Sequence, residues 1–353
     1  MCGIVGIQGI DDVAHDLAFG LTCLQHRGQD AAGIVTFSDK FHLKKAKGLV
    51  GSIFDEETLN EMKGQLGLGH VRYATQGTAD VHDAQPFYMN YPFGIAMIHN
   101  GNVTNFSKLA GRLRSGHRLV ETSNDLELIL YTFSSLLEKR DLDKVTVNDI
   151  FECVAQTQKL CEGAYSVLSM IAGKGLLAFT DPHGIRPLVM GVRHRDNGNE
   201  HAFASESTCL ESLGFTVLRP LEAGEAVFID KFGEVHNRSL TQQGRAFCVF
   251  EYIYFAREDS TFSAGLVAEM RVKMGKLLAR KFRARNLTPD VVIDVPSTAF
   301  YSAFGLANEL NIPVIFDPVG AGASEFRNET TKRIFDESSN DNIKFFPSEN
   351  KAK

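Results

Sequence analysis

Short apolar runs separated by Gly, Asn and Asp follow one another from residue 2 to about residue 230. They are rich in β-branched and aromatic residues, as half-buried or fully buried strands are. The runs span residues 2–9, 30–37, 41–48, 66–75, 94–101, 164–173, 175–181, 187–193, 201–207 and 225–230. This pattern predicts a segment dominated by strands, which ends in a hairpin and a linker at residues 230–245.

Three stretches between these runs have the apolar spacing of helices. They span residues 13–27, 123–140 and 146–163, and the last two begin at capping residues, a Ser/Asn/Asp cluster and Thr146. Helices grouped apart from many antiparallel strands predict an α+β domain built in layers. We therefore expect a first domain over residues 2–240.

The pattern changes after about Cys248. The next elements are a basic amphipathic helix at 267–285, a buried strand at 290–296, a helix at 297–310 and a strand at 312–318. Alternating strands and helices predict the start of a parallel, doubly wound α/β domain, here residues 246–316. From Glu325 onward the chain is polar, and we expect residues 317–353 to form a divergent tail.

Composition and charge narrow the functional classes. The 353 residues carry a formal net charge of -6, without a run of basic residues that could bind nucleic acid. No apolar stretch reaches the roughly 18 residues of a membrane span, and the first residues lack the features of a secretory signal. The six cysteines are scattered and include no C-x-x-C pair, which argues against a zinc site or a disulfide framework. We expect a cytoplasmic protein with reduced thiols.

A cysteine stands directly after the initiator methionine. If Met1 is removed, Cys2 has a free α-amino group beside its thiol, and the ordinary pKa values of the two groups are roughly 8 and 8.5. The amine can then act as the base for its own nucleophile, as in enzymes with an N-terminal Thr. The alternative is that Cys2 is a small buried hydrophobe on the first strand, since free Cys is among the most buried residue types.

A cysteine that attacks an amide needs donors for the oxyanion and groups that bind the charged end of the substrate. The motif HNGN follows an apolar strand, and a turn there would present the Asn100 side chain and the Gly101 N–H to one point. An ordinary Asn-Gly turn is the alternative. Arg72, with Thr75 beside it, suits a carboxylate, although surface arginines are common.

Two further candidates lie at the ends of predicted helices. Asp125 begins a helix, where it either caps the helix or receives a substrate ammonium group. Arg27 lies where a predicted helix ends and the chain continues through Gly28 into a strand. It is a candidate for a second polar contact with the substrate.

These motifs, in this order, strongly resemble the glutaminase domain of amidophosphoribosyltransferases. The motifs are MCGIVGI, LQHRGQDAAGI, GHVRYATQGTADVHDAQPF, HNGN and SNDLE, followed by DPHGIRPLVMG, ASES, LEAGEAV and CVFEYIYFAREDS. The similarity covers roughly residues 1–300. Other class II amidotransferases, including glucosamine-6-phosphate synthase and asparagine synthetase, also begin with MCGI, but LQHRGQD and HVRYAT favour the purine enzyme.

The resemblance implies an N-terminal-nucleophile hydrolase fold, an αββα sandwich, and a reaction in which glutamine gives a Cys2 thioester and ammonia. In complete family enzymes the ammonia displaces pyrophosphate from phosphoribosyl pyrophosphate and gives phosphoribosylamine, the first step of purine synthesis. By the same match, the site residues would be Cys2 as nucleophile, Asn100 and Gly101 at the oxyanion, Arg72 at the glutamine carboxylate, Asp125 at its amino group, and Arg27 and Thr75 among the substrate-binding residues.

The resemblance breaks in the second domain. The family's acceptor site has a strand ending in paired acidic residues and a phosphate-binding loop, similar to VDDSIVRGTT, and neither this stretch nor one similar to KNRYVGRTF occurs here. Residues 307–337 resemble hydroxyethylthiazole kinase instead, which indicates a hybrid, a disrupted reading frame or an assembled sequence. A diverged, truncated relative with a chance similarity is the alternative. We expect only the incomplete start of a type I phosphoribosyltransferase domain.

Two functional hypotheses follow, with a sugar or acyl kinase as a remote third. The first is a glutamine amidotransferase that hydrolyses glutamine at Cys2 and forms no phosphoribosylamine without an intact subunit. The second is a non-catalytic relative that acts only in assembly, or a folding-compromised product, because a truncated parallel sheet leaves an exposed edge.

The expected ligands follow from the first hypothesis. We expect glutamine, and phosphoribosyl pyrophosphate only if the acceptor site is completed, with no nucleic acid or membrane partner and with assembly into a homo-oligomer. We expect no cofactor in this chain, because magnesium belongs to the missing phosphoribosyl pyrophosphate site. Some family members hold an iron–sulfur cluster, but Cys248 alone cannot ligate one.

Overall fold

The computed structural model describes residues 2–73, 81–241, 243–295, 298–316 and 343–345. The chain forms two compact units. The first contains the chain up to Glu251 together with Phe255–Ser263, and the second contains Tyr252–Tyr254 and the chain from Ala264 onward. The three domains expected from the sequence, 2–240, 246–316 and 317–353, stay predictions.

Two antiparallel sheets form the centre of the first unit. The first sheet has the order β11 (Thr216–Pro220), β9 (Val189–Arg195), β10 (Gly198–Ala204), β1 (Gly3–Gln8), β4 (Leu66–Arg72), β2 (Ala31–Phe37) and β3 (Phe41–Lys47). The second has the order β13 (Val235–Ser239), β12 (Glu225–Asp230), β8 (Gly175–Thr180), β7 (Gly163–Ile171), β6 (Ile95–Val103) and β5 (Phe87–Met89). The predicted strands in this segment are confirmed, and β12 and β13 form the predicted hairpin. β5 and β11 were not predicted, because such short strands show little alternation.

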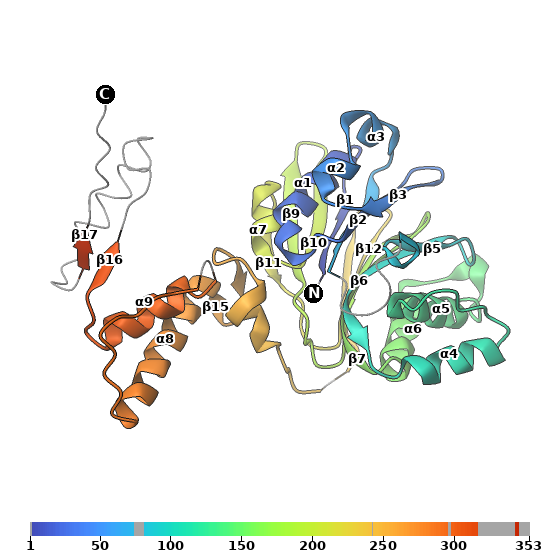
Figure 1. The fold of residues 1–353 in the computed structure, drawn as a ribbon. Helices are drawn as coiled ribbons and strands as arrows, with labels where there is room; N and C mark the ends of the chain where they lie inside the picture. Colours follow the sequence, from blue (N-terminus) through green and yellow to red (C-terminus); the bar gives the residue numbers. More distant parts are fainter. Residues whose placement is uncertain (1, 74–80, 242, 296–297, 317–342, 346–353) are drawn as a thin grey trace. The chain divides into compact units, whose positions relative to one another are not determined.

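Helices cover both outer faces of this pair of sheets (Figure 1). On the first sheet, α1 (Ala14–Cys23) contacts β1 and β4, and α7 (Ser207–Ser212) contacts β10 and β11. On the second sheet, α5 (Asp125–Leu137) contacts β6, α6 (Val147–Leu160) contacts β12, and α4 (Phe106–Ser115) packs on α5. Two short helices, α2 (Val50–Ile53) and α3 (Glu56–Glu61), follow β3. The predicted αββα sandwich of an α+β domain is therefore confirmed.

Apolar layers fill the sandwich, and two of them involve the second sheet. The layer between the sheets includes Ile4, Leu68 and Ile98, and the layer between the second sheet and its helices includes Met97. Successive residues of a strand point to opposite faces. On β6, even-numbered residues therefore face the first sheet, and odd-numbered residues face the helices.

The second unit contains two packed helices and a pair of parallel strands. The helices are α8 (Val267–Ala284) and α9 (Phe300–Glu309), and the strands are β16 (Val314–Phe316) and β17 (Ile343–Phe345). A short strand, β15 (Gly265–Leu266), precedes α8, and β14 (Thr261–Phe262) belongs to the first unit. The predicted helices at 267–285 and 297–310 and the predicted strand at 312–318 are confirmed where the structure describes them. Most of the tail at 317–353 lies outside the described residues.

The predicted buried strand at 290–296 is wrong. Residues 290–295 form no strand, and Val291, Ile293 and Val295 are 66%, 84% and 75% exposed. A strand that is apolar on both faces is stable only between sheet neighbours. In the part of this unit that the structure describes, β16 and β17 pair with each other and leave this segment without such neighbours.

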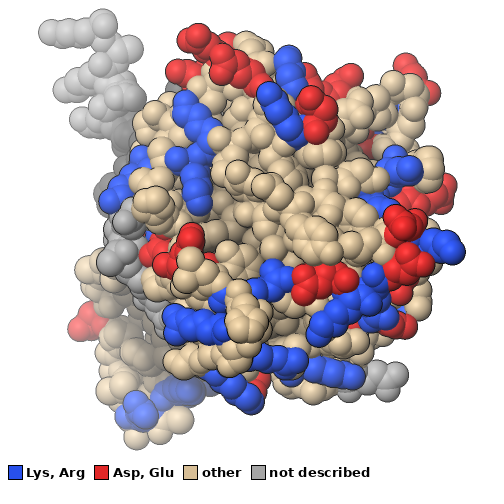
Figure 2. Space-filling model, turned by 90° about the vertical axis from the view of Figure 1, so that its right-hand side faces the viewer, with Lys and Arg blue, Asp and Glu red and all other residues tan. Residues whose placement is uncertain are grey.

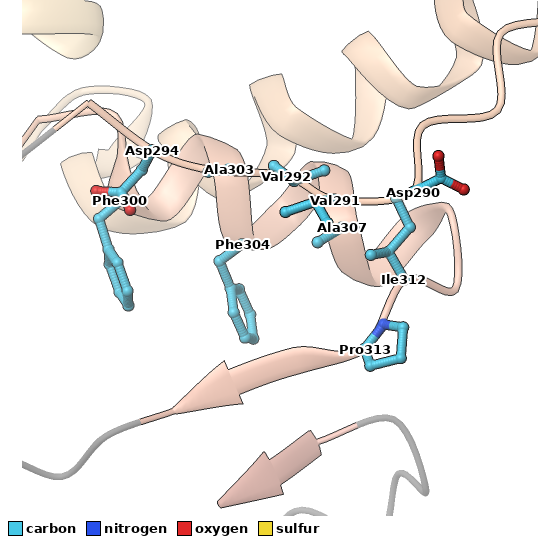
Figure 3. Close-up of a pocket in the computed structure, with 10 residues that line it drawn as sticks. All are labelled: Asp290, Val291, Val292, Asp294, Phe300, Ala303, Phe304, Ala307, Ile312 and Pro313. Atoms are coloured by element: carbon cyan, nitrogen blue, oxygen red, sulfur yellow. The ribbon is translucent and has the colours of Figure 1, made fainter. Parts of the chain in front are cut away.

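A mainly apolar pocket lies beside this segment (Figure 3). Val291 and Val292 line it together with side chains of α9, from which Phe300 and Phe304 project in one direction. Asp290 and Asp294 belong to the same lining. Among the predicted site residues that the structure describes, none belongs to this lining.

Charges of both signs occur on the face of the molecule in Figure 2. On the face in Figure 2, Lys and Arg side chains intermingle with Asp and Glu side chains, and neither sign forms a continuous field there. Among the helices that the structure describes, none has both the length and the apolar character needed to cross a membrane.

Gly33 on β2 lets the chain around Gln85 lie directly on the first sheet. A Cβ atom at Gly33 would lie 2.2 Å from the Gln85 carbonyl oxygen. Gly33→Ala is therefore expected to lower the free energy of unfolding by about 3 kcal/mol, since backbone atoms must move. Gly51→Ala in α2 is the control, because its Cβ would meet no atom within 4 Å and Ala favours a helix by up to about 1 kcal/mol. Urea unfolding compares the variants, and equal stability would contradict this close packing.

Candidate functional site

Cys2 directly precedes β1, the central strand of the first sheet. β1 pairs with β10 on one side and with β4 on the other, where Gly3 lies opposite Val71. Extending this register by one residue places Cys2 opposite Arg72. The side chains of Cys2 and Ile4 point to the same face, so Cys2 faces the space between the two sheets.

Asn100, on β6 of the second sheet, contacts Cys2. The backbone N–H of Cys2 donates to Asn100 Oδ1 at 3.2 Å. Asn100 is buried, and within the described residues its Nδ2 has no hydrogen-bond partner. A buried amide N–H without an acceptor is costly. This donor is therefore available to an oxygen atom of a bound molecule.

His99–Asn102 do not form a turn, so both the predicted turn and its ordinary alternative are wrong. These residues continue β6, which pairs with β7 over its full length. A Cβ atom at Gly101 would lie 2.2 Å from the carbonyl oxygen of Ala164, so glycine is what permits this close pairing. Strand register, and not a turn, positions Asn100. The donor role of the Gly101 N–H stays a prediction.

Asp125 is the first residue of α5 but does not cap it. The side chain of Asn124 accepts the backbone N–H of Leu126 at 3.0 Å and is the cap. Asp125 accepts the N–H of Val103 at 2.7 Å and lies 3.0 Å from His99 Nε2. Burial raises the pKa of Asp125, but these interactions outweigh burial and hold the pKa below its ordinary value. A charged carboxylate is therefore held at the end of β6.

Gln85 and His99 orient this carboxylate, and sequence reasoning missed both. Gln85 Oε1 accepts the His99 backbone N–H at 2.7 Å, so the NH2 group of the same amide faces His99 Nδ1, at 2.8 Å. An amide NH2 only donates, so Nδ1 is the acceptor in this contact, and Nε2 is the ring nitrogen beside Asp125. His99 could have been noticed as part of the motif HNGN, but no sequence pattern indicates that it contacts Gln85.

Arg72 is the last residue of β4 and is only 6% exposed, so it is not an ordinary surface arginine. Its Nη2 lies 3.8 Å from Asp83 Oδ2, and the Ser123 hydroxyl donates to the same oxygen at 3.3 Å. The guanidinium is thus held in the interior next to Cys2. Thr75 lies outside the described residues, and its role stays a prediction.

The pKa of the Cys2 thiol lies above its ordinary value. Burial raises its pKa, and the carboxylate of Asp125 adds to this increase. A hydrogen bond from the Tyr73 N–H and the charge of Arg72 act in the opposite direction without reversing the shift. A nucleophile with a raised pKa needs a base. The same interactions show that Cys2, Arg72 and Asp125 lie close enough to influence one another.

Arg27 holds the backbone of Cys2. Its Nε donates to the Cys2 carbonyl oxygen at 3.1 Å, and its other N–H groups bind Glu206 and Glu251. The Arg27 side chain has no exposed surface. Sequence reasoning missed the two glutamates, and a direct contact between Arg27 and substrate stays a prediction.

The assembled site suits an amino acid with a side-chain amide. Arg72 can pair with its carboxylate and Asp125 with its ammonium group, while Cys2 and Asn100 Nδ2 lie beside each other for attack and oxyanion binding. In the described ranges, no group of three or more His, Cys, Asp and Glu residues could hold a metal ion. The expectations about magnesium and an iron–sulfur cluster stay predictions.

Asp125→Asn is expected to raise the KM for the predicted substrate, glutamine, at least about tenfold, because the variant lacks the negative charge that is predicted to pair with the ammonium group. Its pKa is depressed in the folded chain, so Asp125 stabilises the fold above its ordinary pKa of 3.8. This stabilisation is lost as the pH falls through the depressed value. The difference in Tm between parent and variant should therefore be full at neutral pH and shrink in acid.

Asp149→Asn is the matched control for this prediction. Asp149 also lies in the first turn of a helix, α6, and its pKa is also lowered, here mainly by Thr146. Its substitution should leave the KM unchanged. Equal KM values for Asp125→Asn and the parent would exclude a contact between Asp125 and the ammonium group.

Comparisons with known proteins match two family models. A glutamine amidotransferase domain matches residues 70–212, and the hydroxyethylthiazole kinase family matches residues 291–351. The resemblance of residues 307–337 to the kinase is therefore confirmed, and the match begins earlier in the chain than predicted.

Known relatives match most of the chain. An amidophosphoribosyltransferase of Pseudomonas aeruginosa is 45% identical over 88% of this chain and 63% of its own length, and that of Escherichia coli is 42% identical over 89% and 63%. The glutamine phosphoribosylpyrophosphate amidotransferase structure from B. subtilis, complexed with ADP and GMP, has a TM-score of 0.74 and 30% identity over 88% of this chain and 65% of its own. This chain thus spans about 63% of the length of the curated relatives it matches.

Proposed function

We propose that this chain, a homologue of the amidophosphoribosyltransferases that contains a glutamine amidotransferase domain, hydrolyses glutamine to glutamate and ammonia. One observation carries this proposal. The backbone N–H of Cys2 is bound to Asn100 Oδ1, and within the described residues this leaves the buried Nδ2 of the same amide as a free donor near Cys2. A nucleophile and an oxyanion donor next to each other are what amide hydrolysis requires.

The α-carboxylate and the α-ammonium group of the substrate glutamine orient it in the site. Its carboxylate pairs with Arg72, and its ammonium group pairs with Asp125, which Gln85 and His99 hold in place. Both protein groups are largely buried, so each charge pair is stronger than it would be in water. The side-chain amide then lies over Cys2, which lies between the two sheets.

The reaction proceeds in two steps. After removal of Met1, the free amine of Cys2 accepts the thiol proton, and Sγ forms a bond to the amide carbon. The negative oxygen accepts a hydrogen bond from Asn100 Nδ2. The C–N bond breaks, the nitrogen takes the proton and leaves as ammonia, and a thioester remains. Water attacks the thioester, its proton returns to sulfur through the amine, and glutamate leaves.

The acceptor reaction is a separate part of this proposal. A stretch similar to VDDSIVRGTT is not in the sequence of this chain. We infer that phosphoribosylamine forms only if another chain completes the phosphoribosyl pyrophosphate site. Assembly into a homo-oligomer is part of the same proposal.

The experiment is a glutaminase assay on the full chain. Glutamine should give equal amounts of glutamate and ammonia, and added phosphoribosyl pyrophosphate with magnesium should give no phosphoribosylamine. Absence of glutamate from folded protein that has lost Met1 would overturn the proposal. Phosphoribosylamine from this chain alone would overturn the inference about the acceptor site.

A second candidate is a non-catalytic relative that acts in assembly, or a folding-compromised product. The observation that favours it is the exposure of Val291, Ile293 and Val295 in the second unit. Apolar side chains in an unpaired segment of this kind promote association. A monodisperse monomer with full glutaminase turnover would contradict this candidate.

A further inference from the structure

The guanidinium of Arg27 is bound on three sides. Nε donates to the Cys2 carbonyl oxygen at 3.1 Å, and Nη1 donates to Glu206 Oε1 at 2.6 Å. Nη2 lies 3.1 and 3.0 Å from the two carboxylate oxygens of Glu251. Because the guanidinium group is planar, fixing both terminal nitrogens also fixes the direction of the Nε–H bond. The two glutamates therefore determine where the Cys2 carbonyl is held.

Glu206 is anchored by several other groups. Its Oε1 also lies 2.8 Å from His26 Nε2, and its Oε2 accepts the Ser260 hydroxyl at 2.6 Å and the Arg257 N–H at 3.0 Å. Burial raises the pKa of Glu206, but the charge of Arg27 and the hydrogen bonds outweigh burial and hold this pKa well below its ordinary value. Glu206 is thus a charged carboxylate that holds Arg27 in a fixed position.

Glu251 has a simpler environment. Both oxygens bind Arg27, and the residue is fully buried. Burial raises the pKa of Glu251, and the charge of Glu206 adds to this increase. Arg27 and Arg186 act in the opposite direction without reversing the shift, so the pKa lies above its ordinary value. Arg27 is therefore the main group that favours the charged form of Glu251 in the interior.

We propose that Glu251 is a positioning residue for the Cys2 nucleophile, which it holds through Arg27. This inference rests on the proposed glutaminase function. Glu251 lies 224 residues from Arg27 and directly before Tyr252–Tyr254, where the chain passes into the second unit.

The test uses the full chain and the diazoketone analogue of glutamine, which alkylates the thiol of a glutamine site. Glu251→Gln keeps the size of the side chain but weakens its hold on Arg27. The maximal rate of Cys2 labelling should fall between about tenfold and 100-fold, because the thiol is no longer held in line. The analogue concentration that gives half of this rate should stay the same, since Arg72 and Asp125 are unchanged.

Glu200→Gln is the matched control. Glu200 is a buried carboxylate that binds Arg193 at 2.6 Å, and it accepts the Ile10 N–H beyond the far end of β1 from Cys2. Its loss should leave the labelling rate unchanged, even if it lowers Tm. Glu251→Asp keeps the charge but shortens the side chain, and it should label at a rate between those of the parent and Glu251→Gln. Parental labelling rates in Glu251→Gln or Glu251→Asp would overturn the proposal.

A double-variant cycle separates positioning from a general loss of stability. In an Arg27→Met background, Glu251→Gln should cause no further fall in the labelling rate, because the connection is already broken. A further fall by the same factor would show that Glu251 does not act through Arg27. A folded parent chain that has lost Met1 and does not react with the analogue would overturn the glutaminase function itself, which is a distinct result.

Discussion

Cys2→Ala is expected to abolish glutamine hydrolysis, with a fall in kcat of at least about a thousandfold. The variant keeps the backbone N–H that binds Asn100 and the carbonyl that binds Arg27, so the pocket should stay assembled. It loses only the sulfur atom that forms the thioester. Glutamate release at saturating glutamine measures the effect, and calorimetry should show that glutamine still binds.

Cys23→Ala is the control for this experiment. Cys23 is a half-buried free thiol at the end of α1, and the proposed reaction does not use it. Its substitution should leave kcat at the parental value. Turnover by Cys2→Ala within about tenfold of the parent would place the nucleophile elsewhere.

Asn100→Asp is expected to lower kcat at least about 100-fold with little change in KM. The carboxylate keeps an oxygen that can accept the Cys2 N–H but lacks the donor that Asn100 Nδ2 supplies. It also brings a negative charge next to the oxygen on which negative charge develops. The substitution therefore weakens stabilisation of the transition state and leaves substrate binding largely unchanged.

Steady-state kinetics at neutral pH compare the kcat of Asn100→Asp with that of a control variant, Asn199→Asp. Asn199 lies on β10 of the same sandwich and is exposed, so a charge there is solvated and kcat should match the parent. A parental kcat in Asn100→Asp, or an effect confined to KM, would exclude Asn100 as the oxyanion donor.

The layered fold was predictable because its signals are local. Apolar periodicity identified the strands and the main helices of the first unit, and Thr146 was correctly identified as a cap. The candidate site rested on the motifs and their resemblance to a family. Periodicity alone could not have brought Cys2 and Asn100, which are 98 residues apart, into contact.

The errors arose where pairing between distant segments overrides local preference. Asn-Gly favours a turn, but pairing with β7 keeps His99–Asn102 in β6. Residues 290–295 have the composition of a strand but lack neighbours to pair with in the described part of their unit. Glu206 and Glu251 lie 179 and 224 residues from Arg27, and buried ion pairs leave no periodic signal in a sequence.

Intact mass of the full chain, before and after treatment with the diazoketone analogue of glutamine, is the most direct test of an assembled glutamine site at Cys2. We expect a mass without Met1, and a single adduct that is absent in Cys2→Ala. This result would place both the exposed nucleophile and the binding pocket in this chain. A folded chain that keeps Met1, or that stays unmodified, would contradict a working glutaminase site.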